Sequence, residues 1–153
     1  MMVGTADGIG ELEGSGGWDE YSSRVQAVVA VAAIGTLTDT EITKTLVPAI
    51  HKFLGTTIES NPELFRQASP TTYVSADDPP LLLINDELDP HVPIGHAEAM
   101  YSLYTAVGAD VRLVKPKGMH SHRPVANYTE SLEAGRISRF VTLEFLKEHL
   151  VRQ

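Results

Sequence analysis

Three short apolar runs, separated by segments with helical periodicity, constrain the fold of this chain more than any other feature. The runs are Val25–Ile34, Leu81–Ile84 and Asp110–Lys115. The first two are continuous rather than alternating, which is typical of strands buried on both faces of a sheet. Helical segments between the runs and after the last one predict parallel strands joined by right-handed crossovers. We therefore expect one α/β domain over residues 1–153, although three parallel strands are few for a complete doubly wound sheet.

The helices that we expect carry recognisable start and stop signals. Asp39 is suited to cap a helix that ends at Gly55, and Asn61-Pro62 opens a shorter helix. A further helix is expected over Ile94–Val107, where a glycine follows, and a long amphipathic helix closes the chain. The apolar positions that define the first and last helices are Ile42, Leu46, Ile50, Phe53 and Leu54, then Leu132, Ile137, Phe140, Val141, Phe145, Leu146 and Leu150.

Charge and composition exclude several classes of function. Acidic residues outnumber basic ones, 20 against 12, and the formal net charge is −8. Because an acidic surface repels nucleic acids and anionic membranes, we expect neither as a partner. The absence of Cys excludes disulfides, cysteine zinc sites and a cysteine nucleophile. No apolar run approaches the roughly 20 residues that span a bilayer, and the first residues lack a signal-peptide pattern, so we expect a cytoplasmic protein.

Titratable residues gather in two loops, each of which follows an expected strand. Asn85–Pro93 follows the second strand and Pro116–Pro124 follows the third. The loops at the carboxyl ends of parallel strands meet at one edge of the sheet, where functional groups collect. A carboxylate in one loop and a histidine in the next can form an acid–base pair, in which the carboxylate fixes the tautomer of the imidazole.

These two loops carry a resemblance to a known family. The segment Asp86–Pro93 (Asp-Glu-Leu-Asp-Pro-His-Val-Pro) resembles the catalytic-acid loop of α/β-hydrolases, His-Gly-Asp-x-Asp-x-x-Val-Pro, and Lys117-Gly118-Met119-His120 resembles their Gly-x-x-His loop. The segment 68–80 is similar to bacterial acetyl and feruloyl esterases. The chain is thus identified as a C-terminal portion of an α/β-hydrolase of the esterase/lipase group, with an incomplete sheet that matches family strands six to eight. The resemblance implies carboxylic ester hydrolysis, with Asp89 as the catalytic acid and His120 as the catalytic histidine.

Other interpretations of these residues stay open. Asp89 can instead cap the helix that begins near Ile94, and His122 can take the place of His120. An alternative for the acid loop is a cation site built from Asp86, Glu87, Asp89 and His91, but it lacks EF-hand spacing and a second ligand cluster, so we expect no metal and no cofactor. The remaining histidines are expected on the surface or near helix ends: His91, His96, His51 and His149.

The sequence also departs from the family pattern. Asn85-Asp86 stands where the family usually has His-Gly, and the Gly-x-Ser-x-Gly motif of the nucleophile is absent. Ser15, the one serine flanked by glycines, lies in Gly8–Ser23, a polar segment that we expect to be a loop. We therefore expect a chain that is inactive by itself and acts on a small ester only if the missing half is supplied. The alternative is a non-catalytic, self-associating α/β scaffold or the relic of a truncated gene.

The first strand also predicts self-association. In the family fold the strand that matches Val25–Ile34 is interior, and the neighbour that leads into the nucleophile is not part of this sequence. One edge of an apolar strand without Lys, Glu or Pro would then be open, and such an edge is a template for pairing. We expect a homodimer through Val25–Ile34, with aggregation as the alternative outcome.

Overall fold

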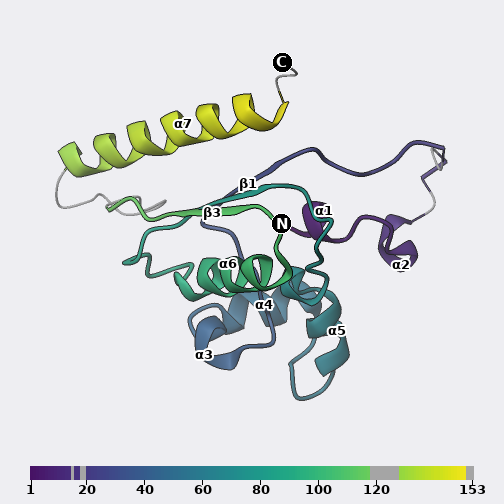
Figure 1. Cartoon of the computed structure of the whole chain (residues 1–153). Helices are drawn as coiled ribbons and strands as arrows, with labels where there is room; N and C mark the ends of the chain where they lie inside the picture. Colours follow the sequence, from purple (N-terminus) through teal and green to yellow (C-terminus); the bar gives the residue numbers. More distant parts are fainter. Residues whose placement is uncertain (15, 18–19, 118–127, 151–153) are drawn as a thin grey trace.

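The computed structural model describes residues 1–14, 16–17, 20–117 and 128–150. Its centre is a parallel sheet in the order β1-β2-β3, formed by Val28–Val31, Leu81–Ile84 and Val111–Val114. Helix α7 lies on one face of the sheet, and helices α3 to α6 lie on the other (Figure 1). The expected α/β architecture with three parallel strands is confirmed.

Strand β1 is shorter than its apolar run in the sequence. It pairs with β2 from Val28 opposite Leu81 to Val31 opposite Ile84. The strand ends there because Ala32 takes a φ of 45°, in the left-handed region, although its N–H still donates to Ile84 O at 2.9 Å. The expectation of a strand over the whole of Val25–Ile34 was therefore too long at both ends.

Strand β2 is the centre of the core and is buried along its full length. Because successive side chains of a strand point to opposite faces, its residues enter two different clusters. Leu81 and Leu83 pack with α6 (Gly95–Val107), while Leu82 and Ile84 pack with Phe145 of α7 (Tyr128–Leu150). The alternating side chains of this four-residue strand thus contact both helical layers.

Helix α6 lies directly under the sheet and ends as expected. Gly108 takes a φ of 76° and caps the helix, a conformation that favours glycine. At the other end, Gly35 from the loop after β1 lies against the helix, and a Cβ there would lie 2.8 Å from both His96 O and Met100 Cγ. Glycine at position 35 is therefore required for the close approach of this loop to α6.

The segment expected as one helix from Asp39 to Gly55 forms two. Helix α3 spans Thr40–Thr43 and α4 spans Val47–Leu54. The break has a local cause, because the ring of Pro48 would clash with the carbonyl of Lys44 in a continuous helix. Both end signals are confirmed, since Asp39 accepts from two backbone N–H groups and Gly55 takes a left-handed φ of 70°.

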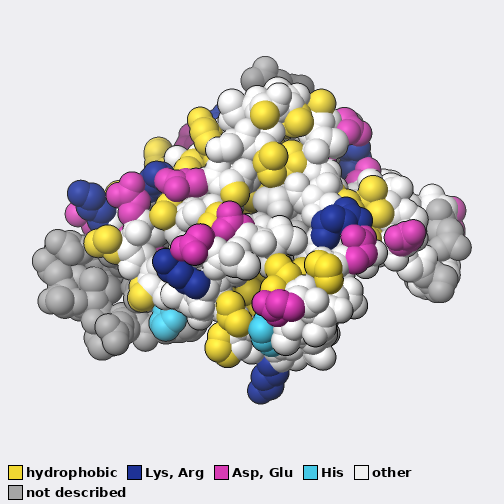
Figure 2. All heavy atoms as spheres, turned by 90° about the horizontal axis from the view of Figure 1, so that it is seen from below, with side chains coloured by type: hydrophobic (Ala, Val, Ile, Leu, Met, Phe, Trp, Pro, Cys, Tyr) yellow, Lys and Arg dark blue, Asp and Glu magenta, His cyan; other side chains and the backbone are white. Residues whose placement is uncertain are grey.

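The other elements of this layer are short. They are α5 (Pro62–Gln67), whose N-cap Asn61 accepts from Leu64 N, and the 3₁₀ helix η1 (Pro70–Thr72). The apolar stripe of α4 differs from expectation, since Ile50 is buried but Phe53 is 80% exposed. Seen from below, this side of the molecule carries hydrophobic side chains in separate patches among charged and polar ones (Figure 2).

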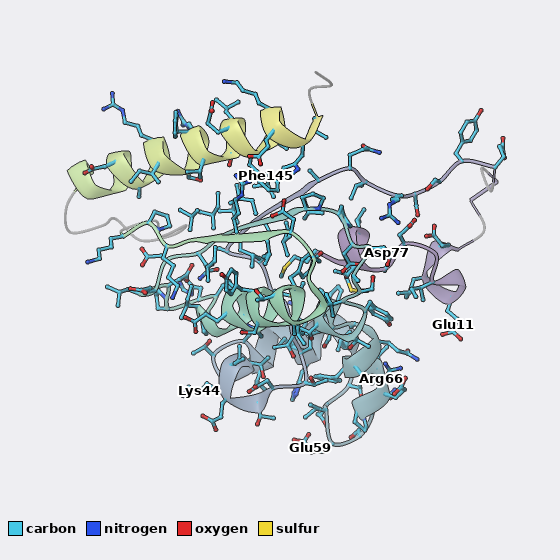
Figure 3. All side chains as sticks on the ribbon, viewed as in Figure 1. Glu11, Lys44, Glu59, Arg66, Asp77 and Phe145 are labelled. Carbon is cyan, nitrogen blue, oxygen red and sulfur yellow. The ribbon has the colours of Figure 1, made fainter. Side chains whose placement is uncertain are left out.

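The two ends of the chain complete the fold. The N-terminal region contains α1 (Met2–Thr5) and α2 (Gly10–Glu13), so the expectation of a loop throughout Gly8–Ser23 was wrong for α2. Phe145 projects from α7 toward the sheet (Figure 3) and is 1% exposed. Among the described helices, none is both long and apolar enough to cross a membrane.

Candidate active site

The loop that follows β2 contains two carboxylates that cap turns of their own loop. The Oδ1 atom of Asp86 accepts the N–H of Leu88 at 2.9 Å. The Oδ1 atom of Asp89 accepts the N–H groups of His91 and Val92, at 2.8 and 2.9 Å. The two aspartates thus fold the segment 86–92, the acid loop, into consecutive side-chain-capped turns.

Asp89 is held in one orientation at the carboxyl edge of the sheet. Its side chain is 6% exposed, and its Oδ2 atom is buried as well. The geometry does not show Asp89 as the cap of α6, because the N-cap of that helix is Ile94 and the Oδ1 atom of Asp89 accepts from His91 and Val92 of its own loop. A carboxylate fixed by two backbone N–H groups can orient a partner without a large rearrangement.

The side chain of Asn85 connects the two ends of the acid loop. Its side chain is 1% exposed, and Nδ2 donates to Asp86 O and to Val92 O, both at 3.2 Å. From the sequence, Asn85 was identified only as a departure from the family pattern, and this contact was not predicted. Its position directly after a buried strand, ahead of two aspartates in turns, was the available signal.

Lys115 connects the acid loop to its surroundings at the end of β3. Its ammonium group lies 2.8 Å from Glu98 of α6 and 3.4 Å from Glu87 of the acid loop. The hydrogen bond to Glu98, followed by the charges of Glu98 and Glu87, raises the pKa of Lys115. The two ion pairs thus join the end of β3 to the acid loop and to α6.

His96 was expected on the surface, and this was wrong. It is fully buried in the first turn of α6, where Nδ1 accepts the N–H of Thr36 at 3.5 Å. Burial lowers the pKa of His96 to about 4, and the negative charge of Asp39 acts weakly in the opposite sense. The imidazole is therefore neutral at neutral pH. His91 in the acid loop is exposed, as expected.

The proposed partners of Asp89 cannot be placed by the structure. His120 and His122 lie in the segment 118–127, which is outside the described residues. Ser15 is also outside the described residues. The pairing of Asp89 with His120, and the choice between the two histidines, therefore stay predictions. What the structure adds is that β2 and β3 are parallel neighbours, so the loops that follow them leave the sheet at the same edge.

Two other features bear on what the site can bind. An apolar groove of about 430 Å³ lies between the N-terminal residues, the loop after β1 and α4, and its lining contains no titratable side chain and no residue of the acid loop. Within the part of the chain that the structure describes, no group of three or more His, Asp or Glu side chains could hold a metal ion.

The comparisons with known proteins agree with the fold. The model of the BD-FAE family matches residues 1–104, which is more than half of the chain. The chain belongs to the BD-FAE family. Esterase LipQ of Mycobacterium tuberculosis (strain ATCC 25618 / H37Rv) is 28% identical over 129 residues, covering 82% of this chain and 31% of LipQ.

Two esterases of low sequence identity are among the solved structures with the same fold. A truncated carbohydrate esterase from gut microbiota matches with a TM-score of 0.69 and 22% identity, over 93% of this chain and 54% of that one. The propionate-bound Est2 esterase of Thermogutta terrifontis matches with a TM-score of 0.67 and 19% identity, over 94% and 50%. The BD-FAE chain therefore has the fold of an esterase-type α/β-hydrolase portion, and it spans about a third to about half of the length of these relatives.

Proposed function

We propose that this BD-FAE chain supplies the acid and the histidine of a Ser-His-Asp site for carboxylic ester hydrolysis. Asp89 would be the acid and His120 the histidine. The observation that carries the proposal is the fixed, buried carboxylate of Asp89 at the carboxyl edge, in the loop that precedes the strand leading to His120. Membership of the BD-FAE family and the similarity to LipQ support the same activity.

Each residue would have a separate role in the reaction. Asp89 would accept the N–H of the imidazole, which fixes the tautomer and stabilises the imidazolium that forms during the reaction. His120 would take the proton of the attacking serine and then give it to the leaving alcohol. A small ester is the expected substrate, and the Thermogutta terrifontis esterase solved with propionate bound is a neighbour in fold.

The chain by itself would be inactive in this scheme. The sequence contains no Gly-x-Ser-x-Gly motif, so no serine is placed on the turn that the reaction needs. We expect no burst of p-nitrophenol from p-nitrophenyl acetate and no labelling by a fluorophosphonate probe. Stoichiometric labelling that disappears in Ser15→Ala would show that the nucleophile had been misplaced.

The acid–histidine pair can be tested without activity. An imidazole N–H that donates to a buried carboxylate gives a proton resonance far downfield in the NMR spectrum. We expect this resonance in the wild-type chain, and we expect Asp89→Asn and His120→Gln each to abolish it. His122→Gln is the matched control and should keep it. Loss in His122→Gln with retention in His120→Gln would move the role by two residues, and absence from the wild type would contradict the proposal.

A non-catalytic, self-associating scaffold is the second candidate function. It is favoured by β1, which in the described part of the sheet has a neighbour on one side only. Val31 on this strand is 47% exposed although it is apolar. Sedimentation at several concentrations tests it, because a scaffold of this kind must form stable dimers and a monomer at all concentrations excludes it.

A further inference from the structure

Asn85 is anchored between the sheet and the acid loop. It directly follows the last residue of β2, and its backbone N–H donates to Val114 O of β3 at 3.1 Å. Its side chain is buried beneath the loop and is 1% exposed. The backbone of Asn85 is thus anchored to the sheet.

The carboxamide of Asn85 can have only one orientation. Both of its partners are backbone carbonyls, those of Asp86 and Val92, and each accepts from Nδ2 at 3.2 Å. A flipped amide would place its oxygen against two other oxygens. Both N–H bonds of the amide group are therefore used, while Oδ1 is buried and has no hydrogen-bond partner among the described residues.

The contact with Val92 connects Asn85 to the carboxylate of the loop. The carbonyl of Val92 accepts from Asn85 Nδ2, and the N–H of the same residue donates to Asp89 Oδ1 at 2.9 Å. Asn85 and Asp89 thus hold Val92 through its two backbone groups. We propose that Asn85 is a positioning residue for Asp89, acting through Val92; this rests on the proposed role of Asp89 as the acid.

The Oδ1 atom of Asn85, which has no partner among the described residues, is consistent with this assignment. The hydrogen bonds that the described structure assigns to this side chain are both made by its N–H groups. Position 85 therefore requires a side-chain nitrogen with two N–H bonds, one for the carbonyl of Asp86 and one for the carbonyl of Val92. An uncharged carboxamide meets this requirement, whereas the carboxylate of aspartate has the same shape and no donor at neutral pH.

The sharpest test compares the same substitution at two asparagines. Asn85→Asp removes the donors that the side chain uses. Asn61→Asp is the control, because Asn61 uses its Oδ1 atom to accept from Leu64 N, and aspartate keeps that oxygen. Amide exchange and amide proton shifts are measured by NMR at His91 and Val92, with Leu82 and Leu83 of β2 as reference positions.

We expect exchange at His91 and Val92 to become about tenfold faster in Asn85→Asp, the effect of losing a hydrogen bond. The amide proton of Val92 should move upfield as its bond to Asp89 loosens, a signature that a general loss of stability would not give. Exchange in β2 should stay at the wild-type rate, and Asn61→Asp should leave the acid loop unchanged. Wild-type exchange and an unmoved Val92 shift in Asn85→Asp would overturn the proposal.

A second measurement covers the case in which Asn85→Asp does not fold. In the wild-type chain, the two side-chain N–H protons of Asn85 should be protected from exchange, because both donate to buried carbonyls. Exchange of these protons at the rate of an exposed asparagine would also overturn the proposal. The outcome is independent of the downfield imidazole resonance, so a failure of this inference and a failure of the acid–histidine pair are distinguishable.

Discussion

His96 accepts the backbone N–H of Thr36 through Nδ1, at 3.5 Å, in a site from which solvent is excluded. The contact joins the first turn of α6 to the loop after β1. Gly35, the neighbour of Thr36, lies so close to the same turn that a Cβ would come within 2.8 Å of His96 O. A proton added to His96 would therefore be a charge without water around it.

We expect His96 to make the stability of the chain depend on pH. Its pKa is about 4 in the folded chain, because of burial, against about 6.5 in the unfolded chain. As the pH falls, the unfolded chain therefore binds the extra proton before the folded chain does. The stabilising contribution of neutral His96 to the unfolding free energy is complete above about pH 6.5 and is lost as the pH falls toward 4. The difference between these two pKa values corresponds to about 3–4 kcal/mol of unfolding free energy at a pH below both.

Urea unfolding at about pH 7.5 and about pH 4.5 measures this contribution. His96→Gln should show a smaller loss of unfolding free energy between the two pH values than the wild type. His91→Gln is the control, because His91 is exposed in the acid loop, and it should behave as the wild type does. An unchanged pH dependence in His96→Gln would show that other groups cause it.

A second expectation concerns the contact between α7 and the sheet. Phe145 is 1% exposed, packs with Leu82 and Ile84, and has the guanidinium of Arg112 5.5 Å from its ring centroid. Phe145→Ala should lower the unfolding free energy by about 3–5 kcal/mol, through lost burial and the cavity that remains. Phe140→Ala on the same helix is the control, because Phe140 is 65% exposed, and it should change stability by about 0.5 kcal/mol or less. Equal effects in chemical unfolding would contradict this placement of α7.

A third expectation concerns the N-cap of α3. Asp39 Oδ1 accepts from Glu41 N at 3.0 Å and from Ile42 N at 3.1 Å. Asp39→Ala should therefore lower the unfolding free energy by about 1 kcal/mol, whereas Asp39→Asn keeps the oxygen and should retain most of the stability. Thermal unfolding of both variants at neutral pH checks this, and an equal loss in both would show that the charge, not the cap, is what matters.

The sequence predicted those features that depend on local signals. The bounds of β2, the stop of α6 at Gly108 and the cap at Asp39 each follow from residues within a few positions. Pro48 is also a local signal for a break, but the apolar periodicity of the sequence continues across it and favours a single helix. Local patterns could therefore predict the elements and the acid loop.

Features that depend on distant contacts were missed. His96 is buried because the loop with Gly35 packs on α6, and these segments are separated by about sixty residues, as the Thr36–His96 bond shows. Likewise, the exposure of Phe53 depends on how α4 is placed beside its neighbours. A histidine or phenylalanine on an amphipathic helix gives no local sign of such contacts.

The last expectation concerns the open edge of β1. The N–H groups of Val28 and Ala32 donate to Pro80 O and Ile84 O, so the residues that alternate with them turn their backbone groups away from β2. In the described part of the chain, no backbone hydrogen bond other than those to β2 is formed along this strand. An apolar strand with unpaired backbone groups and no charge is a template for a second copy, and two-fold pairing is the commonest closed arrangement.

We therefore expect the chain to sediment as a dimer at micromolar concentration and to dissociate on dilution. Val31→Lys places a charge on this edge, where Val31 is 47% exposed, and should weaken the dimer by at least about tenfold, equivalent to about 1.4 kcal/mol. Leu88→Lys is the matched control, because it makes the same change of charge at an apolar residue of the acid loop that is 81% exposed. A wild-type monomer that is unchanged by dilution would contradict self-association, and a dimer that Val31→Lys leaves intact would place the interface on another surface.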